Sequence, residues 1–185
     1  MNSTASTVIV MIVVCVIVVI PPLITMTARV DNVTQQNVQA IVDEFVLEIV
    51  NTGRITKNMY KNFDNKLNTN GNVLYEIDIE IHVLDENPGK KTAQTNYTKI
   101  GENVYLIYYT TQILPAIGIK VDNQDVSSTE QMLLPAGSKV FVKATSEDPT
   151  ANQTLTSSML GFSNAGENAI TASASGMVTV EGGAE

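Results

Sequence analysis

His82 is the one histidine of the chain, and the carboxylates Asp78 and Glu80 precede it at two-residue spacing. On an extended strand this spacing places all three side chains on one face, because successive side chains alternate between faces. Imidazole and carboxylate groups on one face can ligate zinc in principle. A solvated strand face explains the same pattern with no further partner, so we predict neither a metal nor a cofactor here.

A second acidic group, Asp122, Asn123 and Asp125, offers oxygen ligands of the kind that calcium prefers. The glycine and the terminal glutamate of a known calcium loop are missing, so we favour a solvated loop. The chain has no G-x-S-x-G, phosphate loop, dinucleotide fingerprint or Cys/His metal spacing. Its one cysteine, Cys15, lies inside an apolar run, where it reads as a small apolar side chain. We therefore predict that the protein is not an enzyme.

The charge pattern argues against nucleic-acid binding. Nineteen acidic residues against eleven basic ones give a formal net charge of -8. The lysines and arginines are scattered, and a phosphate backbone requires a basic patch. We expect no nucleic-acid partner.

The N-terminus carries thirteen consecutive apolar residues, Val8 to Ile20, and no charged residue precedes Arg29. With its uncharged flanks this stretch is long enough to cross a bilayer. The first seven residues, MNSTAST, include no basic residue, and no A-x-A pattern follows, so we predict a retained anchor rather than a cleaved signal. The predicted anchor and assembly residues are Val8, Val10, Ile12, Val14, Val16, Val18, Ile20, Pro21 and Pro22. The proline pair marks either the membrane boundary, which is the simpler interpretation, or a kink.

Helical periodicity follows the prolines and predicts a helix from about Ala28 to Asn51, ended by Gly53. Its polar side includes Gln35 and Gln39. The apolar face could dock on the chain's own head or on the same helix of a neighbouring subunit. The predicted packing face consists of Val38, Ile41, Val42, Phe45 and Ile49. Thr56 is a candidate N-cap for a second short helix, with Met59, Tyr60, Phe63 and Leu67 on one side, which Asn70-Gly71 ends.

The remainder is rich in strand patterns. Strict alternation over residues 73–84 is typical of a half-buried antiparallel strand. Further strands are predicted at 104–109, 139–144 and 170–180, a short helix at 110–117, a turn at 135–137, and a weak helix or loop at 152–162. The fold class is α+β: a long hydrophobic-then-amphipathic helix with a small, mostly antiparallel head. We expect an apolar transmembrane or filament-core helix over 1–27, a stalk with the second helix over 28–69, and an extracytoplasmic head over 70–185.

This layout resembles a type IV pilin or pseudopilin, in which the apolar half-helix anchors the subunit and later packs in the filament core. A second resemblance covers residues 42–91, 99–113 and 172–180, which are similar to an uncharacterised, TadE-like family of Firmicutes membrane proteins that accompanies tight-adherence-type pilus genes. The residues that carry it are Thr52-Gly53-Arg54-Ile55-Thr56, Tyr60, Phe63, Gly71-Asn72 and Tyr75 to Ile81. Pilins have a glutamate at the fifth mature position; this chain has Ala5, and residues 2–28 contain no acid.

The resemblance implies a cell-surface protein, and we expect a structural subunit of an extracellular pilus-like filament or of a pilus or secretion machine. Its partners would be copies of itself or other pilus-machine subunits, and the lipid bilayer before assembly. The alternative is a monomeric single-pass membrane protein with an extracytoplasmic binding or adhesion module.

Overall fold

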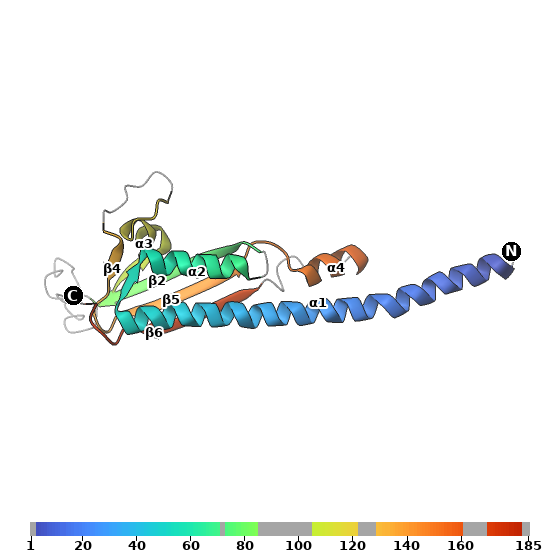
Figure 1. Ribbon diagram of the computed structural model, residues 1–185, viewed down its shortest axis with the longest axis horizontal. Helices are drawn as coiled ribbons and strands as arrows, with labels where there is room; N and C mark the ends of the chain where they lie inside the picture. Colours follow the sequence, from blue (N-terminus) through green and yellow to red (C-terminus); the bar gives the residue numbers. More distant parts are fainter. Residues whose placement is uncertain (1–2, 71–72, 85–104, 122–128, 161–169, 183–185) are drawn as a thin grey trace, which may run out of the picture.

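The computed structural model describes residues 3–70, 73–84, 105–121, 129–160 and 170–182. Its helices are α1 (Ser3–Thr52), α2 (Lys57–Thr69), α3 (Thr110–Ala116) and α4 (Ala151–Leu160). Its strands are β1 (Arg54–Thr56), β2 (Tyr75–Leu84), β3 (Tyr105–Tyr109), β4 (Gln131–Leu133), β5 (Lys139–Ser146) and β6 (Thr171–Met177). A head that contains the sheet lies at one end, and α1 projects from it (Figure 1). The predicted α+β class is confirmed.

The helix α1 is continuous over 50 residues, which corresponds to a length of about 75 Å at 1.5 Å per residue. The long hydrophobic-then-amphipathic helix that the sequence predicts is confirmed, and it continues through Pro21 and Pro22 without a break. Each proline lacks the N–H that would bond the carbonyl four residues earlier, so Ile17 and Val18 lose their helical donors. Figure 1 shows the N-terminal part of α1 curving away from the line of the rest.

Four strands form an antiparallel sheet in the order β3-β2-β5-β6. Glu80 of β2 lies opposite Tyr109 of β3 and Phe141 of β5, which in turn lies opposite Ser175 of β6. The alternation predicted for β2 is confirmed, since Ile79 and Ile81 are buried while Asp78 on the other face is exposed. A second, two-stranded sheet joins β1 to β4. The sequence does not reveal β1 and β4, because three-residue strands are too short to show a period.

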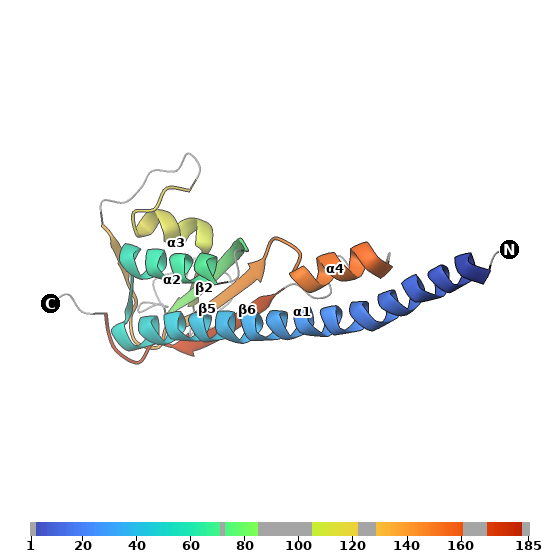
Figure 2. The ribbon, with the colours of Figure 1, turned by 45° about the vertical axis from the view of Figure 1, so that its right-hand side comes forward.

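One face of the four-stranded sheet is covered by α1 and α2, which lie side by side in both ribbon views (Figures 1 and 2). Phe45 of α1 and Phe63 of α2 stack with ring centroids 4.2 Å apart and planes 6° apart. Both rings belong to the same buried cluster as Ile79, Ile81 and Val140 of the sheet. The predicted stalk (28–69) and head (70–185) therefore share one core, and the second half of α1 is part of the head.

Two glycines allow the chain to fold closely around α1. Gly53, at φ +63°, donates its N–H to the Ile49 carbonyl at 2.8 Å and ends α1 as predicted. Gly176 of β6 faces Val46 and Val50, and a Cβ on it would lie 2.6 Å from Val50 Cγ2. A side chain at 176 would therefore push the helix away from the sheet.

Candidate assembly surface and sheet groove

The N-terminal half of α1 is an apolar surface that the head leaves uncovered. The large apolar residues from Val8 to Val19 are each 47–69% exposed, and Cys15 is also exposed. Exposure at consecutive positions means that the helix is apolar on all sides, as expected of a segment that lipid or other protein surrounds. Within the described part of the chain, α1 is the one helix long and apolar enough to cross a membrane.

All the predicted anchor residues are exposed except one. Ile20 is half-buried, whereas Pro21 and Pro22 are exposed within the helix. The exposed apolar members are Val8, Val10, Ile12, Val14, Val16 and Val18. We call residues 8–19 the apolar half of α1.

The predicted packing face contacts the chain's own head. Val38, Val42, Phe45 and Ile49 are 0–3% exposed, and Ile41 is partly buried against the same core. The sequence left two candidate partners for this face, the chain's own head and the same helix of a neighbouring subunit. Within this single chain the head covers the face. It is therefore already filled and adds nothing to the surface that remains free for neighbours.

Two glutamines of α1 that the pattern places on the polar side bind the edge of β6. Gln35 Nε2 donates to the Thr171 carbonyl at 2.5 Å, and Gln35 Oε1 accepts from the Thr171 N–H at 3.2 Å. Gln39 binds Ser173 in the same way at 2.9 and 3.3 Å. The helix therefore both covers the sheet and binds the backbone of Thr171 and Ser173 at its β6 edge, which fixes the second half of α1 to the head.

The helix α4 lies beside α1 beyond the end of the sheet, towards the N-terminus (Figures 1 and 2). Thr150 caps its start through a reciprocal pair: Thr150 Oγ1 accepts from Gln153 N at 3.3 Å, and Gln153 Oε1 accepts from Thr150 N at 2.9 Å. Thr27 Oγ1 of α1 lies 3.3 Å from Asn152 Oδ1 of α4. The sequence gives only a weak helix here and no sign that it docks on α1.

The other face of the four-stranded sheet, which we call the outer face, carries a groove of about 610 Å³. Its lining includes Glu80, Tyr109, Phe141, Lys143, Ser173 and Ser175. Exposed rings beside charged and hydroxyl groups are a common composition for binding surfaces. Beside the groove, the His82 ring lies 5.1 Å from the Phe141 ring, and Lys139 Nζ lies 4.9 Å from the Tyr105 ring centroid.

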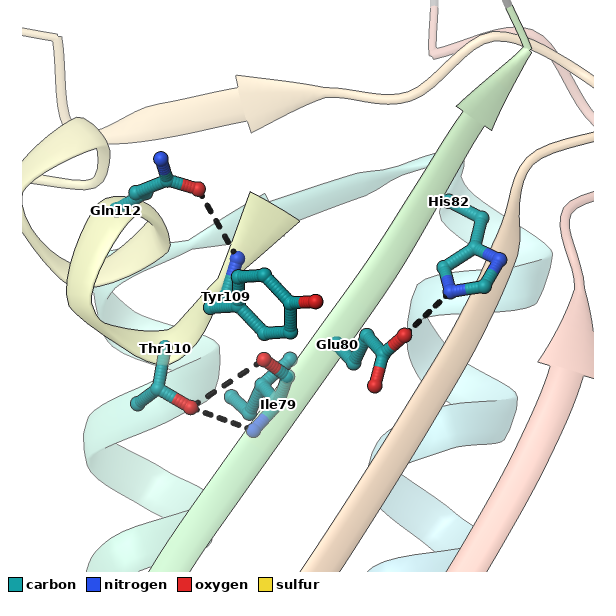
Figure 3. Close-up of polar contacts among 6 residues, drawn as sticks. All are labelled: Ile79, Glu80, His82, Tyr109, Thr110 and Gln112. Atoms are coloured by element: carbon teal, nitrogen blue, oxygen red, sulfur yellow. Dashed lines mark hydrogen bonds and ion pairs between the residues drawn. The ribbon is translucent and has the colours of Figure 1, made fainter. Parts of the chain in front are cut away.

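The candidate metal residues of β2 form a pair rather than a cluster. His82 Nε2 lies 2.5 Å from Glu80 Oε1 (Figure 3), while Asp78 lies opposite Lys143 of β5. Among the described residues no group of three or more His, Cys, Asp or Glu side chains is placed to hold a metal ion. Asp122, Asn123 and Asp125 lie outside the described residues.

Figure 3 also shows how the groove's wall is built where β3 ends. The Thr110 hydroxyl accepts from the Ile79 N–H at 2.6 Å and lies 3.3 Å from the Ile79 carbonyl, so a side chain continues the ladder between β3 and β2. Gln112 Oε1 accepts from the Tyr109 N–H at 3.2 Å and fixes the start of α3. Tyr109 is thereby held at the groove's margin.

No protein-family model, curated protein or solved structure matches this chain. The pilin-like and TadE-like resemblances therefore stay predictions from the sequence, and the surfaces described above carry the functional argument.

Proposed function

We propose that this protein is a structural subunit of an extracellular pilus-like filament, or of a pilus or secretion machine, and that it assembles through the apolar half of α1. The observation that carries the proposal is the exposure of residues 8–19 on a helix whose other half is fixed in the core of the head. A surface of this kind must be covered by lipid or by protein. Its continuity with a rigid head is what a polymer of regularly placed heads requires.

The energetics favour an apolar surface that is buried first in lipid and later against other subunits. In a bilayer the lipid tails already satisfy the apolar side chains, so helix association gains little from the hydrophobic effect. Outside lipid, burial of each Val or Ile side chain contributes about 1.5–3 kcal/mol. Several such side chains per subunit would hold a polymer together without a covalent bond.

The absence of acidic residues over 2–28 bears on how copies would align. No carboxylate is present there to pair with a neighbour's amine, and α1 contains no glycine that would allow close helix contact. We infer that the apolar half packs through branched side chains alone, and that contacts between heads set the spacing of the subunits.

The test is to shear cells that make the protein and to ask where the chain sediments. The proposal expects a high-molecular-weight surface fraction that contains the full chain. Recovery of the whole pool as a detergent-soluble monomer would contradict it. An unrelated single-pass membrane protein followed in parallel reports contamination of the sheared fraction by membrane.

A second candidate is a monomeric, membrane-anchored binding or adhesion protein, and the groove on the outer face favours it. Phe141 and Tyr109 both line this groove and are 39% and 54% exposed, so two aromatic rings are available there to contact a ligand. In this case Phe141→Ser would remove cell adhesion while the chain stays monomeric. The filament proposal expects unchanged recovery of polymer for the same variant unless heads meet at this face.

A further inference from the structure

The helix α4 has a composition and a position that the filament proposal does not use. It contains no charged residue, and none lies between Asp148 and Glu167. From its contact with α4 at Thr27 towards the N-terminus, α1 is likewise uncharged, since no charged residue precedes Arg29. Two uncharged segments, α4 and the part of α1 up to Ala28, therefore meet at the end of the head that faces the membrane in the proposed function.

The position of α4 along α1 follows from one contact between the two helices and from the direction in which α4 runs. Thr27 meets Asn152 near the start of α4, and α4 runs from there towards the N-terminal end of α1 (Figures 1 and 2). Met159 lies seven residues after Asn152, a rise of about 10 Å. Its level on α1 is therefore close to Ile20.

Burial on α1 agrees with this placement. Ile20, Ile24, Thr27, Ala28 and Asp31 are half-buried, whereas Leu23, Met26 and Val30 between them are exposed. Spacings of four, three, one and three residues line one helix face. Thr27 of this face contacts Asn152 of α4, which lies along α1 in both ribbon views.

A membrane-spanning helix needs about 20 apolar residues, and the uncharged stretch of α1 ends at Ala28. A span of that length starting at Ala5 ends near Ile24, which lies between the two ends of α4. The C-terminal half of α4 therefore falls at the level where the bilayer's hydrocarbon meets its headgroups.

The hydroxyl side chains of α4 already have partners within α4 or its cap, which lowers the free-energy cost of placing them at this level. Thr154 Oγ1 donates to the Thr150 carbonyl at 3.0 Å, and the Ser157 and Ser158 hydroxyls donate to the Thr154 carbonyl at 3.1 and 2.7 Å. Thr156 Oγ1 lies 3.4 Å from Asn152 Oδ1. A hydroxyl that already donates to a carbonyl of its own helix loses little when water is removed.

We propose that the C-terminal half of α4, with the 44%-exposed Met159 at its tip, enters the interface of the lipid bilayer beside α1. The partner is a lipid surface, which α4 contacts through uncharged groups. The head would then meet the membrane at two points, the span of α1 and the tip of α4, and would be held upright rather than swivelling about α1. This inference rests on the membrane-anchored state of the proposed function.

The uncharged character of α4 distinguishes this contact from electrostatic attachment. Interfacial binding through lysine or arginine weakens as salt rises, and it strengthens with anionic lipid. Insertion of α4 should neither weaken as salt rises nor strengthen with anionic lipid, because none of its side chains carries a charge.

The experiment uses the full chain reconstituted into phosphatidylcholine vesicles, with an environment-sensitive dye on a single cysteine. The native Cys15 reports insertion of α1. On a Cys15→Ser background, Met159→Cys reports the tip of α4, and Ser175→Cys on the exposed outer face is the matched control. Lipids brominated at the upper part of the acyl chain serve as the quencher.

The proposal expects the dye at 159 to be quenched to at least about half the extent seen at Cys15, with no change in high salt or with anionic lipid, as for an apolar interfacial contact. The dye at 175 should remain unquenched. Quenching at Cys15 without quenching at 159 would overturn the inference and leave the anchored state standing. Absence of quenching at Cys15 would overturn both.

Discussion

Gln39 of α1 binds both backbone groups of Ser173 at the edge of β6, donating to its carbonyl at 2.9 Å and accepting from its N–H at 3.3 Å. Gln35, one turn earlier, binds Thr171 in the same way. The two spacings match, because four residues of a helix rise about 6 Å and two residues of a strand about 6.6 Å. At Thr171 and Ser173 the side-chain amides thus take the place of a neighbouring strand and occupy backbone groups that another chain could otherwise bind.

Replacement of both glutamines by alanine should open the β6 edge. We expect Gln39→Ala to lower the free energy of unfolding by about 1 kcal/mol, since water can replace a partner at this exposed edge. Amide hydrogen exchange gives the sharper measurement: protection at Thr171 and Ser173 should fall in the double variant. Ala172, which pairs with Ala144 of β5, should keep its protection.

Gln36→Ala is the matched control for this prediction, because Gln36 is exposed on the same helix. It should change neither the stability nor the exchange of β6. Equal exchange at Ser173 in the wild type and in the double variant would show that the glutamine contacts do not protect the edge.

The turn after α1 gives a second prediction. Gly53 has φ +63°, and a Cβ at this position would lie 2.4 Å from the Val180 carbonyl oxygen and 2.6 Å from Gly182 N. Gly53→Ala therefore combines left-handed strain of about 1–2 kcal/mol with a clash against backbone. We expect a loss of more than about 3 kcal/mol in urea unfolding, several times the cost of a typical surface change.

Gly137→Ala separates strain from clash. Gly137 also has positive φ, at +89°, but the nearest atom to its added Cβ would be Leu84 Cδ2 at an ordinary 3.6 Å. It should cost about 1–2 kcal/mol from strain alone. Equal losses for the two variants would mean that the packing of residues 180–182 against Gly53 contributes nothing.

The alkaline stability of the head depends on Tyr60. Burial, assisted by the nearby Asp64 carboxylate, raises the pKa of Tyr60 to about 12 from its ordinary value of 10.0. Between these values the unfolded chain has lost the phenolic proton while the folded chain keeps it, so stability falls as pH rises. Below pH 10 the contribution is fully present.

Tyr60→Phe should therefore unfold at the same urea concentration as the wild type near pH 8 and at a higher one than the wild type near pH 11.5. Burial also raises the pKa of Tyr75, but this residue is present in both proteins and cancels in the comparison. Parallel stability profiles for the two proteins from pH 8 to 11.5 would contradict the prediction.

The sequence was sufficient to predict the structure wherever one residue, or a short local pattern, determines the backbone conformation. Thr56 begins α2 and accepts a hydrogen bond from Met59 N at 3.2 Å, Gly53 ends α1, and the alternation of β2 assigns its two faces. In each case the chemistry that fixes the conformation lies within a few residues, so a short window of sequence contains it.

Contacts between distant segments were not predictable in this way. Gln35 and Gln39 look like solvated helix residues, because their role depends on a strand more than 130 positions away. The assembly of α4 on α1 through Thr27 and Asn152 is hidden for the same reason. The proline pair predicts a membrane boundary or a kink; the helix continues through both prolines, each of which removes one backbone hydrogen bond.

The apolar half of α1 gives the last prediction. Val14→Asp with Val18→Asp places two carboxylates on a surface that the proposal buries in lipid and then among neighbours. Each would oppose membrane insertion by roughly 2.5–3.5 kcal/mol, and in a filament core each would be a buried, unpaired charge. We expect polymer in the sheared fraction to disappear, while the head keeps its protease resistance because Val38 to Ile49 are unchanged. Leu47→Asp is the matched control: Leu47 is 59% exposed on the same helix but outside the apolar half, so assembly should persist. Intact filaments built from the double variant would show that the apolar half is not the core of the polymer.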